Sequence, residues 1–169
     1  MSRKKRLMGI GLLILLLASC AASEPEDSIR QVIRRGADLA ERHDLGGLLG
    51  LTTKNFIAMP GRKDRDETKG ILWMAFRYYE KFRIIYPEPE VDLEEKGRTA
   101  SARVYFLMVR ERRTFPRLEA LYKDPQGWLK EVGEKADLYR LDLDWFNEDG
   151  DWLVAKAHLE PFRGTGFER

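Results

Sequence analysis

The strongest constraint on the fold of this chain is a pair of strictly alternating segments near its C-terminal end. In residues 137–147 and 151–160 apolar and polar side chains take turns, with the period of two that a strand with one buried face requires. Glu148, Asp149 and Gly150 lie between the segments and favour a tight turn. The pattern predicts a β-hairpin with a three-residue loop, in which Gly150 takes the left-handed conformation.

The length of this loop decides which residues face one another. A three-residue loop makes one face wholly apolar, and it pairs Trp145 with Leu153, Leu143 with Ala155, Leu141 with Ala157 and Tyr139 with Leu159. The other face then pairs Asp142 with Lys156, Arg140 with His158 and Phe146 with Trp152. A two-residue loop would set Leu143 against Lys156 and mix the faces, which the period-two rule disfavours.

Ahead of the hairpin the sequence predicts three helices and three strands. The first helix starts near Asp27 and the second is short, around Leu48 to Leu51. The third is capped by Asp66, runs to about Arg83 and has an apolar stripe formed by Ile71, Leu72, Ala75, Phe76, Tyr79 and Phe82. Strands are expected over 54–59, 91–95 and 100–111, and residues 112–135 are expected to form a lid or a long hairpin arm.

This order of elements, with the acidic-Gly-Asp-Trp turn at 148–152, resembles the nuclear-transport-factor-2-like superfamily, including its ketosteroid-isomerase-like and polyketide-cyclase-like branches. The resemblance covers residues 27–162. It implies an α+β fold, with a curved antiparallel sheet wrapped around about three N-terminal helices to form a cone with a pocket. It also implies that homodimers through the outer face of the sheet are frequent.

The N-terminal segment has the composition of a targeting signal. Residues 3–6 are all basic, and the apolar run from Leu7 to Leu17 is too short to span a bilayer, which takes about 20 residues. Leu17-Ala18-Ser19-Cys20 resembles the lipobox of bacterial lipoproteins, in which the cysteine is acylated and becomes the new N-terminus. We therefore expect a signal peptide at 1–19, a tether at 20–26, one domain at 27–162 and a tail at 163–169.

The anchor has consequences for charge, cysteine chemistry and location. Without the four basic residues at 3–6, 26 of the 30 basic residues remain against 28 acidic ones, a net charge of −2 that gives no reason to expect nucleic-acid binding. Cys20 is the only cysteine, which excludes an intrachain disulfide. The resemblance implies two or three acyl chains on Cys20 and a periplasmic location. Ala21, where inner-membrane lipoproteins carry Asp, favours the outer membrane of a Gram-negative cell.

Catalytic candidates are few. Isomerase-type relatives need an inward-facing Asp base with a tyrosine or neutral acid, but the expected register turns Asp142 and Asp144 to the outer face. Arg103 has no visible pair of Asp partners for an epoxide-hydrolase-type site. His43 near a helix end and His158 on the surface give no metal site, and no cofactor is expected.

Binding residues are easier to nominate. The candidates for lining a pocket are Tyr79, Tyr105, Tyr139 and Trp145, and those for an interface on the outer sheet face are Phe146, Trp152 and Lys156. We expect a lipid-anchored, non-enzymatic periplasmic module that holds a small apolar ligand or a protein partner. The alternative is an isomerase- or cyclase-type enzyme that uses a pocket Asp.

Overall fold

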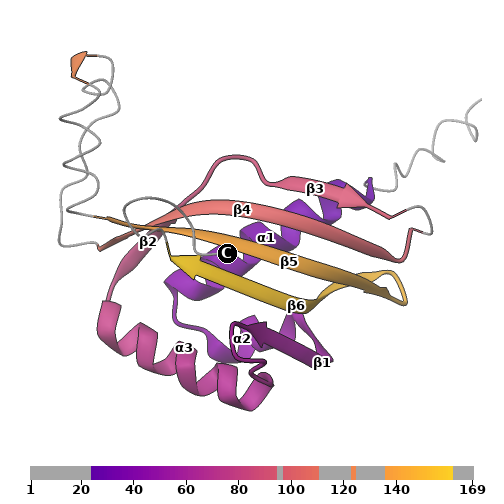
Figure 1. Ribbon diagram of the computed structural model, residues 1–169, viewed down its shortest axis with the longest axis horizontal. Coiled ribbons are helices and arrows are strands. Elements are labelled where there is room, and N and C mark those ends of the chain that lie inside the picture. The colour runs from indigo at the N-terminus through magenta and orange to yellow at the C-terminus, as the bar shows by residue number, and fades with distance from the viewer. Residues whose placement is uncertain (1–23, 95–96, 111–122, 125–135, 162–169) are drawn as a thin grey trace, which may run out of the picture.

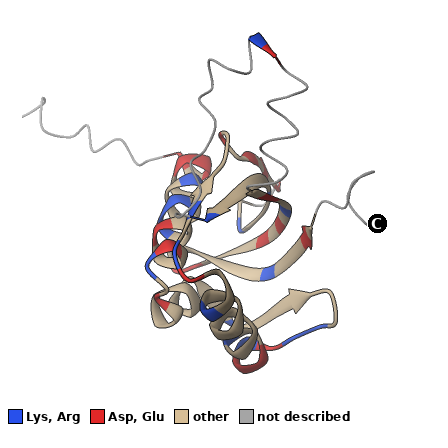
Figure 2. Cartoon of the chain, turned by 90° about the vertical axis from the view of Figure 1, so that its left-hand side faces the viewer, with Lys and Arg blue, Asp and Glu red and all other residues tan. Residues whose placement is uncertain are grey.

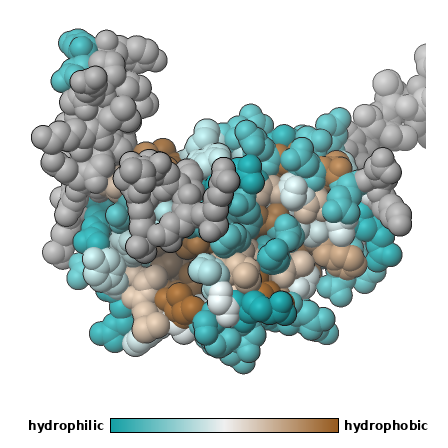
Figure 3. All heavy atoms as spheres, in the orientation of Figure 1, coloured by the Kyte–Doolittle hydropathy of each residue, from teal (hydrophilic) through white to brown (hydrophobic). Residues whose placement is uncertain are grey.

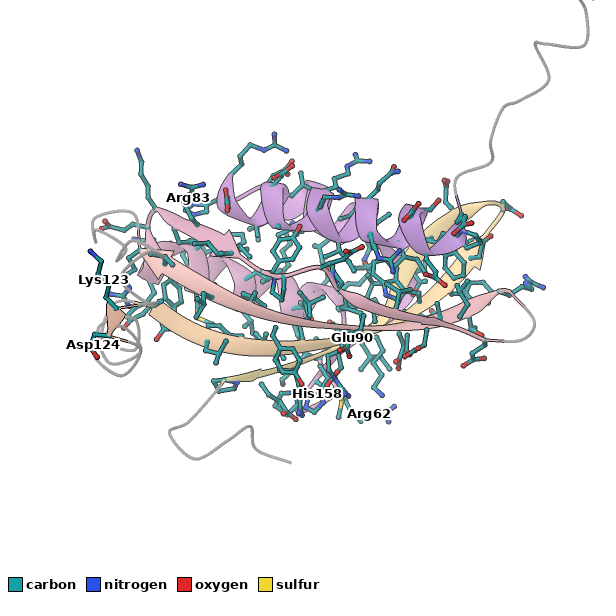
Figure 4. The ribbon with its side chains drawn as sticks, turned by 90° about the horizontal axis from the view of Figure 1, so that it is seen from above. Arg62, Arg83, Glu90, Lys123, Asp124 and His158 are labelled. Atoms are coloured by element: carbon teal, nitrogen blue, oxygen red, sulfur yellow. The ribbon has the colours of Figure 1, made fainter. Side chains whose placement is uncertain are left out.

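A computed structural model describes residues 24–94, 97–110, 123–124 and 136–161. Its helices are α1 (Pro25–Glu41), α2 (Leu45–Gly50) and α3 (Arg65–Tyr79). Its strands are β1 (Thr52–Met59), β2 (Phe82–Ile85), β3 (Glu90–Leu93), β4 (Thr99–Arg110), β5 (Ala136–Glu148) and β6 (Asp151–Pro161). The fold is α+β, with a curved and unclosed sheet and with α1 crossing one of its faces (Figures 1 and 4), as expected.

The sheet has the order β1-β6-β5-β4-β2, and β3 lies beside the other half of β4. All pairs are antiparallel except β1 and β6, which run parallel. The segments expected over 54–59, 91–95 and 100–111 are thus β1, β3 and β4, while β2 was not foreseen. Residues 1–23, most of 112–135 and 162–169 lie outside the described residues, so the lid or arm stays a prediction.

Helix α1 packs its inner side against the sheet and contacts β2 at its C-terminal end. Pro25 opens it, where a missing N–H costs nothing, and Ile29, Ile33 and Leu39 are buried on its inner side. At its other end the Glu41 carboxylate accepts a hydrogen bond of 2.7 Å from the Ile84 N–H. Because this contact satisfies an exposed donor of a sheet-edge strand, it also shields β2 from pairing with other chains.

Helix α3 begins and ends earlier than expected. Its cap is Asp64, not Asp66, because the Asp64 and Glu67 side chains exchange hydrogen bonds with each other's backbone N–H in a capping box. It ends at Tyr79, not near Arg83, because Glu80 takes a positive φ of 56° and turns the chain into β2. Phe82 therefore belongs to a strand. No helix in the described part of the chain is long and apolar enough to cross a bilayer.

The hairpin of β5 and β6 corrects the expected loop. Glu148 pairs directly with Asp151, so the loop has two residues, Asp149 and Gly150, with φ of 54° and 100°. Positive φ at both positions is what a type I′ turn requires. The faces do not mix, because the register shifts between Asp144 and Trp145, where Ala155 is an extra residue in β6.

The two-residue loop and this shift change all seven predicted pairs. On the apolar face Trp145 faces Val154, Leu143 faces Ala157, Leu141 faces Leu159 and Tyr139 faces Pro161. Asp142 faces His158 instead of Lys156, Arg140 faces Glu160, and Phe146 faces Leu153. Trp152 therefore points inward, with 6% of its surface exposed, and not to the outer face where an interface role was expected. It joins a core whose members come from α1, β1, β4, β5 and β6: Ile29, Ile33, Phe56, Ala100, Ala102, Val104, Leu143, Trp145, Trp152 and Val154.

Candidate ligand site

Two tyrosines meet at the end of the domain where α3 turns into β2. The Tyr79 and Tyr139 hydroxyls are 2.7 Å apart, and Tyr79 also donates to the Asp137 carboxylate at 3.1 Å. Tyr79 is the last residue of α3, while Asp137 and Tyr139 lie two apart on β5 and so share one face. The fold therefore joins residues 58 and 60 positions apart in the sequence.

Aromatic rings and one cation surround this pair. Tyr139 stacks on Phe106 across the β4–β5 pair, with ring centroids 5.3 Å apart. The Arg110 guanidinium lies over the rings of Tyr78 and Tyr79, at 4.8 and 5.0 Å. We call Tyr78, Tyr79, Phe106, Arg110, Asp137 and Tyr139 the tyrosine cluster.

Both central tyrosines are held in the protonated state. Burial raises the pKa of Tyr79 above its ordinary value, and the hydrogen bond with Tyr139 raises it further. Burial also raises the pKa of Tyr139. At neutral pH each hydroxyl therefore has one proton to donate.

The direction of these hydrogen bonds decides what the cluster offers a ligand. An ionised carboxylate only accepts, so the Tyr79 proton goes to Asp137 and Tyr139 must donate to the Tyr79 oxygen. Both protons are then used within the protein. Among the described residues the Tyr139 oxygen and Asp137 keep acceptor positions that no protein donor fills, and the tyrosine cluster suits a ligand that carries a hydroxyl or another donor.

A surface hollow lies beside the cluster. Its volume is about 340 Å³, and its lining comes from the α1–α2 turn and from α3: His43, Leu45, Trp73, Phe76, Arg77 and Glu80. The His43 ring stacks on Phe76 and Phe82, at 4.8 and 5.4 Å. His43 thus acts as an aromatic packing residue, in place of the helix-end contact that the sequence suggested.

A second, charged hollow of about 490 Å³ lies at the start of α3 and is lined by Leu49, Lys54, Asp64, Arg65, Asp66 and Lys69. Neither hollow is lined by the four predicted pocket residues. The structure brings Tyr79 and Tyr139 together, whereas Trp145 is 2% exposed in the core and Tyr105 is 38% exposed on the opposite face of the sheet. A lining role for Tyr79 and Tyr139 stays a prediction.

The outer face of the sheet carries a chain of ion pairs. Asp142 contacts Arg103 at 2.6 Å and Arg140 at 3.3 Å, and Arg140 continues to the buried carboxylate of Glu160. His158 meets Glu160 at 3.3 Å, and Lys156 meets Asp144 at 3.5 Å. Arg103 thus has one Asp partner that the sequence did not reveal, on the outer face. Asp142 and Asp144 face outward, as expected.

Figure 3 shows this outer side of the molecule, because the sheet lies in front of α1 in the orientation of Figure 1. Hydrophilic side chains dominate the view, with smaller apolar areas between them. Phe146 also lies on the outer face, and the Arg98 guanidinium lies over its ring at 5.5 Å. Among the described residues no group of three or more His, Cys, Asp or Glu is placed to hold a metal ion.

Sequence reasoning found Tyr79 and Tyr139 and missed the other four members of the cluster: Tyr78, Phe106, Arg110 and Asp137. Asp137 opens the predicted strand and Arg110 closes another, so nothing in the alternation marks either as functional. The one signal was position, since Val109 and Ala136 pair and bring the two strand ends side by side.

Comparisons with known proteins show the class of fold. No family model matches the sequence, and no curated protein matches it either. Among solved structures, an NTF2-like protein of unknown function from Pseudomonas putida KT2440 superposes with a TM-score of 0.60 at 15% identity, over 83% of this chain and 89% of that chain.

Two further structures come from Novosphingobium aromaticivorans. One is an NTF2-like protein with a cystatin-like fold, with a TM-score of 0.59 at 16% identity, over 96% of this chain and 94% of that one. The other is a putative scytalone dehydratase, with a TM-score of 0.60 at 13% identity, over 85% and 87%. The helices and the curved, unclosed sheet thus define the fold as α+β. More particularly, the fold is the NTF2-like, or cystatin-like, fold.

Proposed function

We propose that this chain is a binding module held by a lipid on Cys20 at the periplasmic side of a bacterial membrane. In a Gram-negative cell the outer membrane is the expected location. The support is the order of a basic segment, an eleven-residue apolar run and Leu-Ala-Ser-Cys, directly ahead of a folded domain that starts at Pro25. One acyl chain is a marginal anchor and two or more are a stable one.

The module binds a small apolar ligand with a hydroxyl group at the tyrosine cluster, and it does so without catalysis. The observation that carries this proposal is the use of both tyrosine protons within the protein, because an enzyme that stabilises an oxyanion needs a free donor aimed at the substrate. Asp142 and Asp144 are held in outer-face ion pairs, which removes the pocket bases first considered.

The alternative is an enzyme of isomerase, cyclase or dehydratase type. Two observations favour it: one structural neighbour is described as a putative scytalone dehydratase, and Asp137 touches Tyr79. Against it, Asp137 is exposed, whereas a general base in this kind of chemistry is shielded from water so that its pKa rises. A binding role needs only the acceptors that the cluster already offers.

Anchoring is tested by feeding cells a tagged fatty acid and recovering the protein. The native chain should carry the label and Cys20→Ser should not. Ser19→Ala keeps a small residue beside the cut and is the matched control, which should be labelled like the native chain. A labelled Cys20→Ser protein, or an unlabelled native one, contradicts the anchor.

Ligand binding is tested with naphthol, an apolar ring that carries one hydroxyl, followed by its fluorescence. Tyr139→Ala should weaken binding at least tenfold, while Tyr105→Ala, on the opposite face of the sheet, should leave it unchanged. Methoxynaphthalene has the same ring without the O–H and should bind more weakly than naphthol. Equal effects of the two substitutions would place binding elsewhere.

A further inference from the structure

Helix α3 exposes more apolar surface than a solvated helix needs. Ile71, Met74 and Tyr78 are 45%, 59% and 68% exposed and recur at three- and four-residue spacing, so they form one stripe along the helix. Trp73, at 51%, lies beside it. Exposed apolar side chains gathered on one element mark an interaction site rather than ordinary surface. We call Ile71, Trp73, Met74 and Tyr78 the α3 stripe.

The surroundings of the α3 stripe carry positive charge. Arg77 lies over the Trp73 ring at 4.9 Å, and Arg110 lies over Tyr78. Lys81 and Arg83 follow the helix directly and are exposed, with Arg83 at this end of the molecule in Figure 4. The acidic neighbours at this end are Glu80, Asp137 and Glu41, which contacts Ile84, and the four basic side chains outnumber them. Apolar side chains with Trp and Tyr among Lys and Arg are the composition of a helix that lies in a membrane interface.

The opposite end of the domain has the reverse charge. The first turn of α1, the β3 strand and the β5–β6 turn meet there, since Arg30 contacts Glu88 and Thr99 pairs with Phe146. The described charged residues of this end include two basic ones, Arg30 and Arg98, and nine acidic ones: Glu24, Glu26, Asp27, Glu88, Asp92, Glu94, Glu148, Asp149 and Asp151. Figure 2 shows the red first turn of α1. Anionic lipid therefore repels this end and attracts the other.

The tether is long enough for the domain to change its orientation relative to the membrane surface. Four residues lie between Cys20 and Pro25, and the five steps from one Cα to the next reach at most about 18 Å. Repulsion between exposed charges is felt within about 8 Å at physiological salt, so the acidic end can stand clear of the surface while it stays attached. The domain can then pivot about the start of α1 and lower α3.

We propose that the α3 stripe is a second membrane contact, which docks on anionic lipid headgroups once the lipid on Cys20 has brought the domain to the bilayer. This inference rests on the anchoring proposed above. It also names a route for the ligand: Tyr78 belongs to both the α3 stripe and the tyrosine cluster, so an apolar molecule dissolved in the membrane reaches the acceptors of Tyr139 and Asp137 without crossing water.

The test uses acylated protein in vesicles of phosphatidylethanolamine and phosphatidylglycerol. Cys20 is the only native cysteine, so acylation blocks its thiol and an introduced cysteine takes a fluorescent dye alone. A dye on Met74→Cys should be quenched by bilayer-embedded quenchers several-fold more than a dye on Gln31→Cys, an exposed position on α1. Ile71→Ser together with Tyr78→Ser, or vesicles of phosphatidylcholine alone, should abolish the difference.

The outcomes separate the two proposals. Protein that does not float with the vesicles contradicts the lipid anchor. Protein that floats with both dyes equally quenched contradicts the α3 contact and leaves the anchor intact. A Met74→Cys dye that becomes shielded with rising protein concentration, without vesicles, assigns the stripe to a second copy of the chain and also overturns the membrane contact.

Discussion

At the scale of single residues, the hydrogen-bonded pair Tyr79 and Tyr139 is the central feature of the candidate site. Its two hydrogen bonds point in one direction, because Tyr139 donates to Tyr79 and Tyr79 donates to Asp137. That direction decides between a site that stabilises an anion and a site that accepts a donor. A change of a single hydroxyl is therefore expected to alter both the stability of the protein and the ligand binding proposed above.

Tyr79→Phe should lower the free energy of unfolding by about 1 kcal/mol at neutral pH, because it removes the donor to Asp137 and the acceptor of Tyr139. Denaturant titration measures this loss. Tyr105→Phe changes an exposed tyrosine on the opposite face and should stay close to the native value.

The same pair makes stability depend on alkaline pH. The pKa of Tyr79 is raised in the folded state, so its contribution is complete below the unfolded pKa of about 10 and is lost as the pH rises beyond it. Between pH 9 and pH 11 the native chain should lose more stability than Tyr79→Phe. A loss of the same size in both chains would show that the pair does not govern the alkaline transition.

Periodicity places residues well when burial is one-sided. It assigned Asp142 and Asp144 to the outer face, because their neighbours in β5 are apolar. It misplaced Trp152, because Leu153, Ala155, Ala157 and Leu159 form an equally apolar row. The apolar phase in fact changes at Ala155, from Trp152 and Val154 to Ala157. The larger ring of Trp152 has the greater need for burial, and that difference was the available signal.

At the scale of elements, the β5–β6 hairpin combines a turn whose two residues, Asp149 and Gly150, have positive φ with a bulge at Ala155 in β6. A two-residue type I′ turn matches the twist of the strands, and the bulge restores the phase that this turn would otherwise break. The hairpin was predictable from alternation and turn residues, whereas its loop length depended on the bulge, which alternation alone does not reveal.

Two glycines test this assignment against each other. Gly150 has φ of 100° and no atom within 4 Å of an added Cβ, so Gly150→Ala should cost about 1–2 kcal/mol through backbone strain alone. Gly70 has the same open space inside α3, so Gly70→Ala should stabilise the protein by about 0.5–1 kcal/mol. The melting temperatures of the two variants should move in opposite directions, and a neutral Gly150→Ala would contradict the positive φ that the type I′ turn requires at residue 150.

For the molecule as a whole, stability rests on a core that α1, β1 and three strands of the sheet share. Trp145 and Trp152 lie at its centre. Their rings fill the space between α1 and the sheet that a pocket at this level would need. The ligand site is therefore proposed at the tyrosine cluster, at the other end of β5. The general fold followed from the order of elements, while the location of free surface depended on which tryptophan pointed inward.

Trp152→Ala should destabilise the domain by about 3–5 kcal/mol, a large share of the stability of a domain of this size. Phe146→Ala, on the outer face, should cost about 1 kcal/mol. Chemical denaturation of the two variants compares them directly. If the two losses are equal, Trp152 does not occupy the core.

The parallel pairing of β1 with β6 has a consequence for the order of folding. It joins Thr52 to Val154, so β1 can join the sheet only after β6, the last strand in the described part of the chain, has been added. Trp152 and Val154, which complete the core, arrive with that same strand. A chain that emerges from a translocation channel N-terminus first therefore stays open until β6 has passed through, and contacts so distant in sequence form slowly. For the export proposed above, this late strand would keep the polypeptide unfolded until β6 has left the channel.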